Sequence, residues 1–389
     1  MNKRQRVLFY FILNLYFFSS CISETKKGVF IPAVPEVNEI TRRRAAIVFL
    51  TDVIDAFPNS SENYYKRAIL YFENENIKLA LDDINNAILI KPNVGNYFQV
   101  KALILRDSDS PRLALEAALK AEVLDIESPE LYTLLGDLYQ QLGQFNKAKS
   151  YLRKALQISP NNGETYFYQG EMAAKMADTS TAILLYKQVL GLKPSFLPAY
   201  LKLVQVYTNL KDYDTALMYG SEAIKYHRSN ASLYLQIGNT YQSAWKADSA
   251  IINYAKAITL DTNLVEASFN TGIIYFKSRA YRFALPFFER SFRHNPKYPD
   301  AKFLMAQCLE FSGEYVKAEE LYNQMLVENN QDYKALVGIA RVQRKVVYRD
   351  YISTDATKID STAFPKFDSP KRSITDTTSL KPMLPKGIN

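Results

Sequence analysis

The stretch "PELYTLLGDLYQQLGQFNKAKSYLRKALQISPNN", residues 129–162, decides the fold of this chain. Its apolar residues recur with helical spacing in two runs, which are separated by a turn at Gly143 and closed by Pro160. The stretch therefore predicts two helices joined by a short turn.

The same pattern returns every 34 residues. One position of the second helix holds alanine nine times in succession, at Ala46, Ala80, Ala114, Ala148, Ala182, Ala216, Ala250, Ala284 and Ala318. One position of the first helix stays mostly small, in the series Ala68, Ala102, Gly136, Gly170, Val204, Gly238, Gly272, Ala306 and Ala340. Small residues let two helices approach closely, while Tyr, Phe and Leu fill the space between neighbouring hairpins.

This period and its small and aromatic positions resemble the tetratricopeptide repeat, and the resemblance covers residues 41–349. It implies an all-α fold, a right-handed superhelical solenoid of helix-turn-helix hairpins. We count eight full repeats from Ser61 to Asp332, which start at residues 61, 95, 129, 163, 197, 231, 265 and 299. Lone helices over about 41–56 and 333–349 resemble half-repeats. The basic residues Arg341, Arg344 and Lys345 of the last helix are expected to form a solvated cap.

The first 20 residues have the pattern of a secretion signal. Lys3, Arg4 and Arg6 precede an apolar run of about 12 residues, which is shorter than the roughly 20 residues that cross a bilayer. The following residues Phe18-Ser19-Ser20-Cys21 resemble the lipobox of bacterial lipoproteins, which implies that Cys21 carries the lipid. An ordinary secreted protein with an incidental cysteine, or an uncleaved short anchor, are the alternatives.

The regions outside the repeats are predicted to be a flexible tether and a disordered tail. Residues 21–40, with Pro32 and Pro35, are expected to form a lipidated tether. Cys21 is followed by neither an Asp nor an acidic cluster, features that in lipoprotein families favour inner-membrane retention and surface export. The predicted location is therefore the outer membrane of a Gram-negative bacterium, lipid-anchored and facing the periplasm. Residues 350–389 are predicted to be a disordered tail, with a docking peptide around Phe364–Phe367 as the sharper alternative.

The net charge and the motifs of the sequence argue against a nucleic-acid partner and against catalysis. The formal charge of +8 falls to +5 when the three basic residues of the signal are removed, a mild excess that does not indicate a nucleic-acid partner. The sequence contains no phosphate-binding loop, metal-spaced cluster or nucleophile motif. His227 and His294 are expected at helix ends, and Cys308 in the core. We therefore predict no enzyme, no cofactor and no metal site.

Binding residues follow from the family resemblance. In tetratricopeptide proteins the second, fifth, ninth, twelfth and thirteenth positions of a repeat face the concave groove. The polar and aromatic residues carried over to these positions are Asp137, Phe167, Glu171, Gln205, Asn239, Phe269, Phe303 and Gln307. The polar side chains are suited to hydrogen bonding with an extended peptide. The aromatic rings either bind apolar partner side chains or pack against the neighbouring hairpin. Acidic residues in mid-groove favour a basic partner segment.

The predicted function is that of a non-catalytic adaptor or scaffold at the bacterial envelope. Its partners are expected to be other envelope proteins or peptide segments, within envelope assembly, secretion or gliding-motility machinery, and its membrane contact is the lipid anchor. A binding module for cell-wall or surface glycans is the alternative, because aromatic residues in a groove suit sugars as well as peptides.

Overall fold

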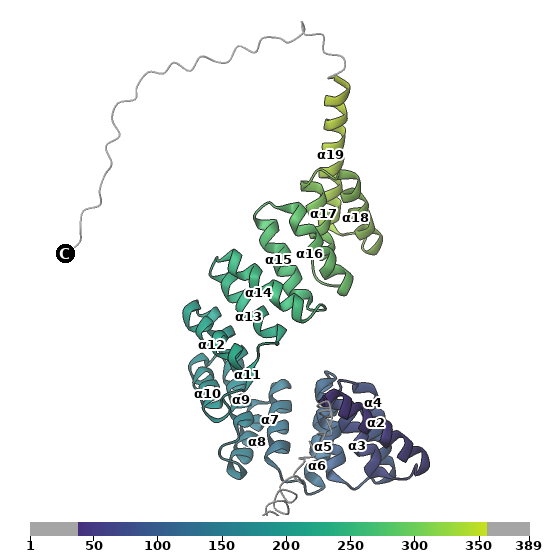
Figure 1. Ribbon diagram of the computed structural model, residues 1–389, viewed down its shortest axis with the longest axis vertical. Helices are drawn as coiled ribbons and strands as arrows, with labels where there is room; N and C mark the ends of the chain where they lie inside the picture. Colours follow the sequence, from purple (N-terminus) through teal and green to yellow (C-terminus); the bar gives the residue numbers. More distant parts are fainter. Residues whose placement is uncertain (1–37, 356–389) are drawn as a thin grey trace, which may run out of the picture. The chain divides into compact units, whose positions relative to one another are not determined.

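The computed structural model describes residues 38–355 of the chain, with side chains described as far as residue 347. These residues form eighteen α-helices and no β-strand (Figure 1). The all-α class predicted from the 34-residue period is therefore confirmed.

Most helices run in pairs of similar length, and in each pair the odd-numbered helix comes first. Their bounds in chain order are α2 (Glu39–Ala56), α3 (Ser61–Glu73), α4 (Ile77–Ile90), α5 (Gly95–Asp107), α6 (Pro111–Val123), α7 (Pro129–Gln141), α8 (Phe145–Ile158), α9 (Gly163–Lys175), α10 (Thr179–Leu192), α11 (Leu197–Asn209), α12 (Tyr213–Tyr226), α13 (Ala231–Ser243), α14 (Ala247–Leu260), α15 (Val265–Lys277), α16 (Tyr281–His294), α17 (Ala301–Phe311), α18 (Tyr315–Glu328) and α19 (Tyr333–Asp355).

The chain divides into two compact units between Leu185 and Tyr186, inside α10. In unit 1, which ends at Leu185, the helices from α2 to α9 each pack on the next. In unit 2, which begins at Tyr186, the helices from α11 to α19 do the same. This packing of consecutive helix pairs is that of an all-α helical solenoid.

The turn from each first helix to its second helix has one shared conformation. The N–H of Gln144, for example, donates to the carbonyl of Tyr139 over 2.8 Å, which is the long hydrogen bond of a Schellman cap. One residue of each turn has a positive φ, in the series Glu75, Asp109, Gly143, Ala177, Lys211, Trp245, Arg279 and Gly313. Only two of these are glycine, so the sequence signals the turn clearly only at Gly143 and Gly313.

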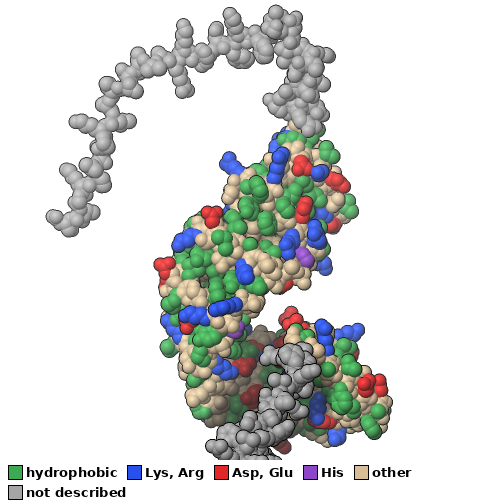
Figure 2. All heavy atoms as spheres, in the orientation of Figure 1, with side chains coloured by type: hydrophobic (Ala, Val, Ile, Leu, Met, Phe, Trp, Pro, Cys, Tyr) green, Lys and Arg blue, Asp and Glu red, His purple; other side chains and the backbone are tan. Residues whose placement is uncertain are grey.

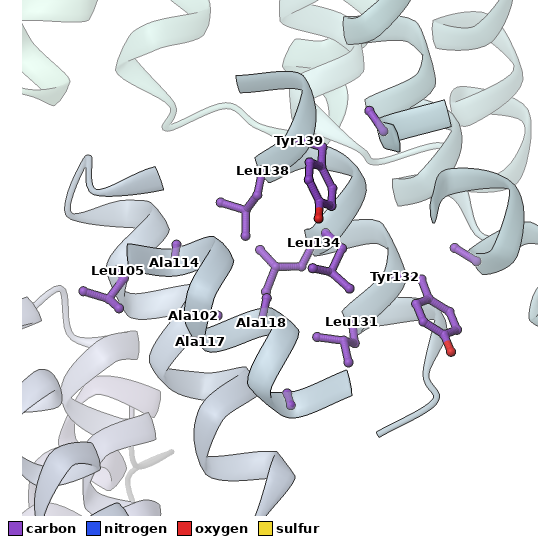
Figure 3. Packing of buried hydrophobic residues seen from close by; sticks show 14 residues of the cluster. Ala102, Leu105, Ala114, Ala117, Ala118, Leu131, Tyr132, Leu134, Leu138 and Tyr139 are labelled. Atoms are coloured by element: carbon purple, nitrogen blue, oxygen red, sulfur yellow. The ribbon is translucent and has the colours of Figure 1, made fainter. Parts of the chain in front are cut away.

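The core follows the predicted small positions. The repeated alanine is fully buried in all eight hairpins from Ala80 to Ala318. A Cβ atom added at Gly136 would lie 2.5 Å from Cδ2 of Leu152, so the Leu152 side chain of the second helix packs directly on the backbone of Gly136. Figure 3 shows the cluster around α5, α6 and α7, where Leu131, Leu134 and Leu138 fill the space between hairpins.

The last small position behaves differently. Ala340 is exposed, whereas Ala306, one repeat earlier, is fully buried. Ala306 packs against the second helix of its own hairpin, and no helix follows α19 in the described part of the chain. The site at residue 340 therefore lacks the partner for which a small residue is needed.

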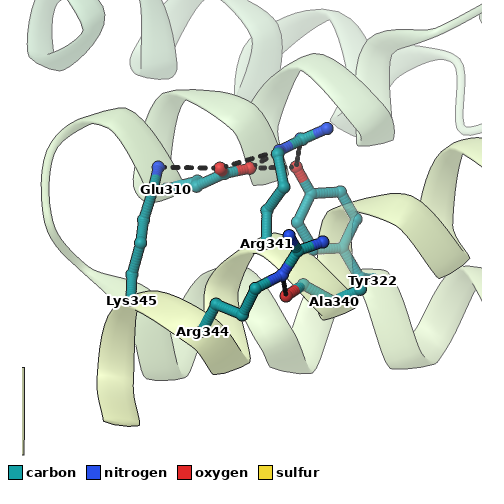
Figure 4. Close-up of polar contacts among 6 residues, drawn as sticks. All are labelled: Glu310, Tyr322, Ala340, Arg341, Arg344 and Lys345. Carbon is teal, nitrogen blue, oxygen red and sulfur yellow. Dashed lines mark hydrogen bonds and ion pairs between the residues drawn. The ribbon is translucent and has the colours of Figure 1, made fainter. Parts of the chain in front are cut away.

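The final helix also differs from expectation at two points. It continues to Asp355, beyond the expected end at Arg349 and into the predicted tail, and no Pro or Gly interrupts residues 345–355. The solvated cap was a wrong prediction for two of its residues, because Arg341 and Lys345 pair with the buried carboxylate of Glu310 (Figure 4). Arg344 is exposed and donates to the carbonyl of Ala340.

The predicted signal peptide, Cys21, most of the tether and tail residues 356–389 lie outside the described residues. Among helices in the described range, none combines the length and the apolar character needed to cross a membrane.

Candidate functional site

The candidate site is the set of groove-facing residues on the first helices, taken separately in each unit. In unit 1, Asp137 lies on α7 with 4% of its surface exposed. Its carboxylate accepts hydrogen bonds from Nε2 of Gln140 at 3.2 Å and from Nε2 of Gln141 at 3.0 Å. This predicted groove residue is thus engaged within its own helix.

Three successive first helices meet around Asp137. Arg106 of α5 donates from Nη1 to the hydroxyl of Tyr168 on α9 over 3.3 Å. The charge of Arg106 acts on Asp137 of α7, and the charge of Asp137 acts on Tyr168. Burial raises the pKa of Asp137, while the hydrogen bond from Gln141 and the charge of Arg106 oppose that rise. Burial, followed by the charge of Asp137, also raises the pKa of Tyr168. The site is therefore a partly desolvated carboxylate between a guanidinium and a phenol.

Sequence reasoning missed Arg106 and Tyr168 as members of this group. Arg106 occupies the twelfth position of its repeat, which the family pattern assigns to the groove, so that signal was present in the sequence. Tyr168 occupies the sixth position, which is outside the pattern. Its neighbour Phe167 is 9% exposed and packs edge-on against the Tyr168 ring at 5.5 Å, and Glu171 is half-buried on the same helix.

In unit 2, Asn239 of α13 is the centre of a hydrogen-bond network between two first helices. Its Oδ1 accepts from the hydroxyl of Tyr254 at 2.7 Å and from Nδ2 of Asn270 on α15 at 3.0 Å. Its Nδ2 donates to Oε1 of Glu266, also on α15, over 3.4 Å. The Tyr254 hydroxyl contacts Oε1 of Gln242 as well. The predicted residue Asn239 thus links two neighbouring repeats, and its partners were not predicted.

The two predicted aromatic residues of unit 2 pack within the fold. The Phe269 ring lies 5.4 Å from Phe288 of its own hairpin and 4.8 Å from Tyr298. The Phe303 ring lies 6.1 Å from Tyr322, and Nζ of Lys334 lies 5.4 Å from its centroid. Both rings stay half-buried. The packing alternative therefore accounts for one face of each ring.

The remaining predicted residues are more accessible. Gln205 is exposed on α11, and Gln307 is half-buried on α17. On the visible face of unit 2, Figure 2 shows hydrophobic side chains beside basic ones, so this surface offers both apolar and charged contacts.

The cysteine and histidine residues considered for catalysis or metal binding have roles in packing and in hydrogen bonding within the fold. Cys308 is fully buried, as predicted, and burial raises the pKa of its thiol to about 12, which keeps it protonated. His227 follows α12 directly, and its Nε2 donates to the carbonyl of Ser195 over 2.7 Å. Within the described range, no three His, Cys, Asp or Glu side chains are grouped so that they could hold a metal ion.

Comparison with known proteins identifies the repeat. Two family models, both described as tetratricopeptide repeat, match residues 129–162, 231–264 and 275–339. No curated protein matches this chain in sequence.

Several solved structures are similar to this chain. The APC/C hetero-tetramer Cut9–Hcn1 is 18% identical over 70% of this chain and 48% of that chain, about half its length, with a TM-score of 0.46. A tetratricopeptide repeat protein from Parabacteroides merdae is 15% identical over 64% of this chain and 98% of that one, with a TM-score of 0.49. The C-terminal part of a TPR repeat-containing protein from Cytophaga hutchinsonii is 17% identical, over 61% and 98%, with a TM-score of 0.48.

The matched segments agree with the 34-residue period and with the consecutive packing of helix pairs. Repeats of this kind support a role in protein–protein interaction, as an adaptor or scaffold. The matched segments of this chain are therefore tetratricopeptide repeats.

Proposed function

We propose that this protein is a non-catalytic adaptor held by a lipid on Cys21 at the periplasmic face of the outer membrane. Its first helices hold peptide segments or partner subunits of envelope machinery for assembly, secretion or gliding motility. The lipobox resemblance supports the anchor, and the repeat family supports protein binding.

The observation that carries the proposal is the network around Asn239. Asn239 and Asn270 come from neighbouring first helices, and Glu266 joins them from the second position of its repeat. A side-chain amide both donates and accepts, so each Asn can exchange its present partners for the N–H and C=O groups of an extended peptide. The adjacent ring of Phe269 is half-buried and can contact an apolar side chain of that peptide.

The charge of these first helices favours a basic segment. Asp137 and Glu171 in unit 1, and Glu266 in unit 2, place carboxylates at or near the groove-facing positions. The more accessible carboxylates of Glu171 and Glu266 can form charge-assisted hydrogen bonds with a partner Lys or Arg.

A pull-down with two matched double variants tests the groove. Gln205→Arg with Gln307→Arg adds two charges on first helices at accessible positions. Met218→Arg with Ile252→Arg adds the same charges on second helices, where the native side chains are 52% and 68% exposed. Partners are crosslinked in the native envelope, solubilised in detergent and identified by mass spectrometry.

We expect specific proteins to be retained by the wild type and the second-helix variant and lost by the groove variant. Partners that persist with the groove variant, or that both variants lose equally, would contradict binding by the first helices. Circular dichroism of both variants checks that the fold is intact.

The anchor needs its own test. We expect an alkynyl fatty acid fed to a Gram-negative host to label the wild type and not Cys21→Ser, which should also leave the membrane fraction. If Cys21→Ser is labelled as strongly as the wild type, Cys21 is not the lipid attachment site and this part of the proposal fails.

One observation favours glycan binding as a second candidate function. Trp245 is 89% exposed in the turn between α13 and α14. It borders a cavity of about 390 Å³ whose polar lining includes Gln242, Ser243 and Lys277. A flat aromatic face beside hydrogen-bonding groups suits a sugar ring. A screen of cell-wall and surface glycans should detect binding that Trp245→Ala abolishes, and no binding in that screen would discard this candidate.

A further inference from the structure

A cavity of about 370 Å³ opens between α4, α5 and α6 in unit 1. Its lining is partly apolar, with Leu81, Phe98, Leu105 and Ala117 among the apolar members, and the last two are 6% exposed. The polar members are Asn85, Lys101, Glu116 and Lys120. The volume lies in the range of sites that take small molecules or single large side chains. The groove-facing residues of α5 are not among its lining residues.

In three other hairpins the corresponding repeat positions hold a pair of stacked aromatic rings. Tyr139 stacks on Tyr151 with ring centroids 5.4 Å apart and an interplanar angle of 12°. Two repeats further along, Tyr207 stacks on Tyr219 at 5.7 Å and 14°. Two repeats beyond that pair, Tyr275 stacks on Phe287 at 5.6 Å and 19°.

These rings occupy the eleventh and twenty-third positions of their repeats. In the repeat that starts at Gly95 the two positions hold Leu105 and Ala117, so neither ring is present. Figure 3 shows the contrast between Tyr139 on α7 and the aliphatic side chains of Leu105 and Ala117 on α5 and α6. The cavity therefore lies at the two repeat positions where three other hairpins hold a stacked ring pair.

The lysine that lies over the rings of the next hairpin has a counterpart at the cavity. In the next hairpin, Nζ of Lys154 lies 4.8 Å from the centroid of Tyr151 and 5.1 Å from that of Tyr132. Its counterpart one repeat earlier is Lys120, which lines the cavity together with Lys101. Neither Lys120 nor Lys101 forms an ion pair with another described side chain. The rim thus offers two unpaired ammonium groups beside one carboxylate, that of Glu116.

The geometry points to this cavity as a docking site for a phenylalanine side chain of a partner protein, in a segment with acidic residues on both sides. The ring would lie on Leu105 and Ala117 under Lys120, which combines apolar burial with a cation–π contact. The net positive rim favours acidic neighbours.

Phenylalanine fits better than tyrosine for a reason that the next hairpin shows. The hydroxyl of Tyr151 donates to Oε2 of Glu122 over 2.9 Å. The residue that corresponds to Glu122 one repeat earlier is Ile88, which has no acceptor. A tyrosine hydroxyl in the cavity would therefore lack the partner that Tyr151 has.

The test uses an acetylated, amidated pentapeptide with a central phenylalanine between two pairs of acidic residues. Its binding to the purified full-length chain is measured by isothermal titration calorimetry. Two control peptides replace the phenylalanine by alanine, or the acidic residues by lysine. We expect the acidic phenylalanine peptide to bind and both control peptides to bind about tenfold more weakly or not at all.

Two variants locate the site. Ala117→Tyr should place a ring where Tyr151 lies in the next hairpin, and should weaken the peptide about tenfold with no loss of thermal stability. Ala255→Tyr makes the same change at an exposed alanine on α14 and should bind as the wild type does. Lys120→Glu, at an exposed rim position, should weaken the acidic peptide and strengthen the lysine-flanked one.

Each of three results would overturn the docking site: no binding to the wild type, equal binding of the alanine peptide, or unchanged binding by Lys120→Glu. If Ala117→Tyr does not fold, the two outcomes with Lys120→Glu still decide the question. The groove variant with Gln205→Arg and Gln307→Arg should bind this peptide normally, so this site and the proposed adaptor groove fail independently.

Discussion

Two buried carboxylates on first helices, Glu310 on α17 and Asp137 on α7, have opposite surroundings. Glu310 is 1% exposed and accepts from Arg341 at 2.8 Å, from Lys345 at 2.9 Å and from the Tyr322 hydroxyl at 3.0 Å (Figure 4). Asp137 is 4% exposed and accepts from two neutral amides of its own helix. The first carboxylate forms direct ion pairs with two cations, whereas no cation among the described residues forms a direct ion pair with the second.

The two pKa shifts follow from this difference. Burial alone would raise the pKa of Glu310, but the hydrogen bonds from Arg341, Lys345 and Tyr322 outweigh it and hold that pKa below its ordinary value. For Asp137 burial prevails, and its pKa is raised. A buried charge that is compensated by ion pairs is tolerated within the fold, whereas a desolvated charge with little compensation is typical of functional sites. The comparison therefore separates a stabilising cap from a candidate binding residue.

The largest effect is expected when both cations of the cap are removed. Arg341→Met with Lys345→Met leaves Glu310 buried with only Tyr322 as donor, and should lower the free energy of unfolding by about 3–5 kcal/mol. Urea denaturation followed by circular dichroism measures this change. Adding Glu310→Leu to the double variant should recover most of the loss, and a triple variant as unstable as the double would show that the charges are unimportant.

Acid should weaken the same cap. Because the folded-state pKa of Glu310 is lowered, its contribution is present above the unfolded carboxyl pKa of about 4.3 and is lost as pH falls through the folded value. The protection factors of α19 amides, which are corrected for the intrinsic pH dependence of hydrogen exchange, should therefore fall in acid more in the wild type than in the triple variant. An equal fall in the two proteins would assign the acid effect to other carboxylates.

A smaller effect is expected for the hydroxyl of Tyr322. Tyr322→Phe removes a donor to a charged acceptor and should cost about 1–2 kcal/mol of unfolding free energy. Tyr254→Phe is the matched control, because Tyr254 occupies the same repeat position and its hydroxyl contacts the neutral amides of Asn239 and Gln242. The loss at Tyr254 should be the smaller of the two, and a larger loss would contradict the role given to charge.

The smallest effect, with the opposite sign, is expected at Asp137. A raised folded-state pKa means that the ionised carboxylate costs stability at neutral pH, and this cost disappears as pH falls through the folded value. Asp137→Asn should therefore raise the free energy of unfolding at pH 7 by up to about 1 kcal/mol, and the gain should fade in acid.

A neighbouring amide favours the same outcome. Oε1 of Gln140 is buried without a hydrogen-bond partner among the described atoms, and an asparagine amide at residue 137 can donate to it. Asp137→Ala is the control, because it removes the acceptor of Gln140 and Gln141 and should destabilise. A loss of stability in Asp137→Asn would show that Arg106 compensates the carboxylate after all.

Sequence periodicity predicted the helices and the core well, because both repeat with the same spacing. The alanine series from Ala80 to Ala318 is buried in every hairpin, as its 34-residue spacing required. Ala340 departs from its series because burial needs a second helix that α19 does not have.

Side-chain partners were much harder to predict. Glu310 lies 31 residues from Arg341 and 35 from Lys345, so their pairing depends on how successive hairpins pack. A charged residue in the sequence does not reveal whether its partner will bury it, which is why Arg341 and Lys345 were expected in solvent. The contact between Arg106 and Tyr168 spans 62 residues and two repeats, beyond the reach of a pattern within one repeat.

The hairpin turns have a consequence for how this chain tolerates mutation. Six of the eight turn residues with positive φ carry side chains that disfavour this conformation, from Glu75 with φ of 60° to Arg279 with φ of 59°. Glycine at any of them would remove that strain at a smaller cost in chain entropy. Glycine substitutions at these turns should therefore raise the stability of the fold. A chain that carries them could tolerate destabilising substitutions on its binding surfaces and still fold.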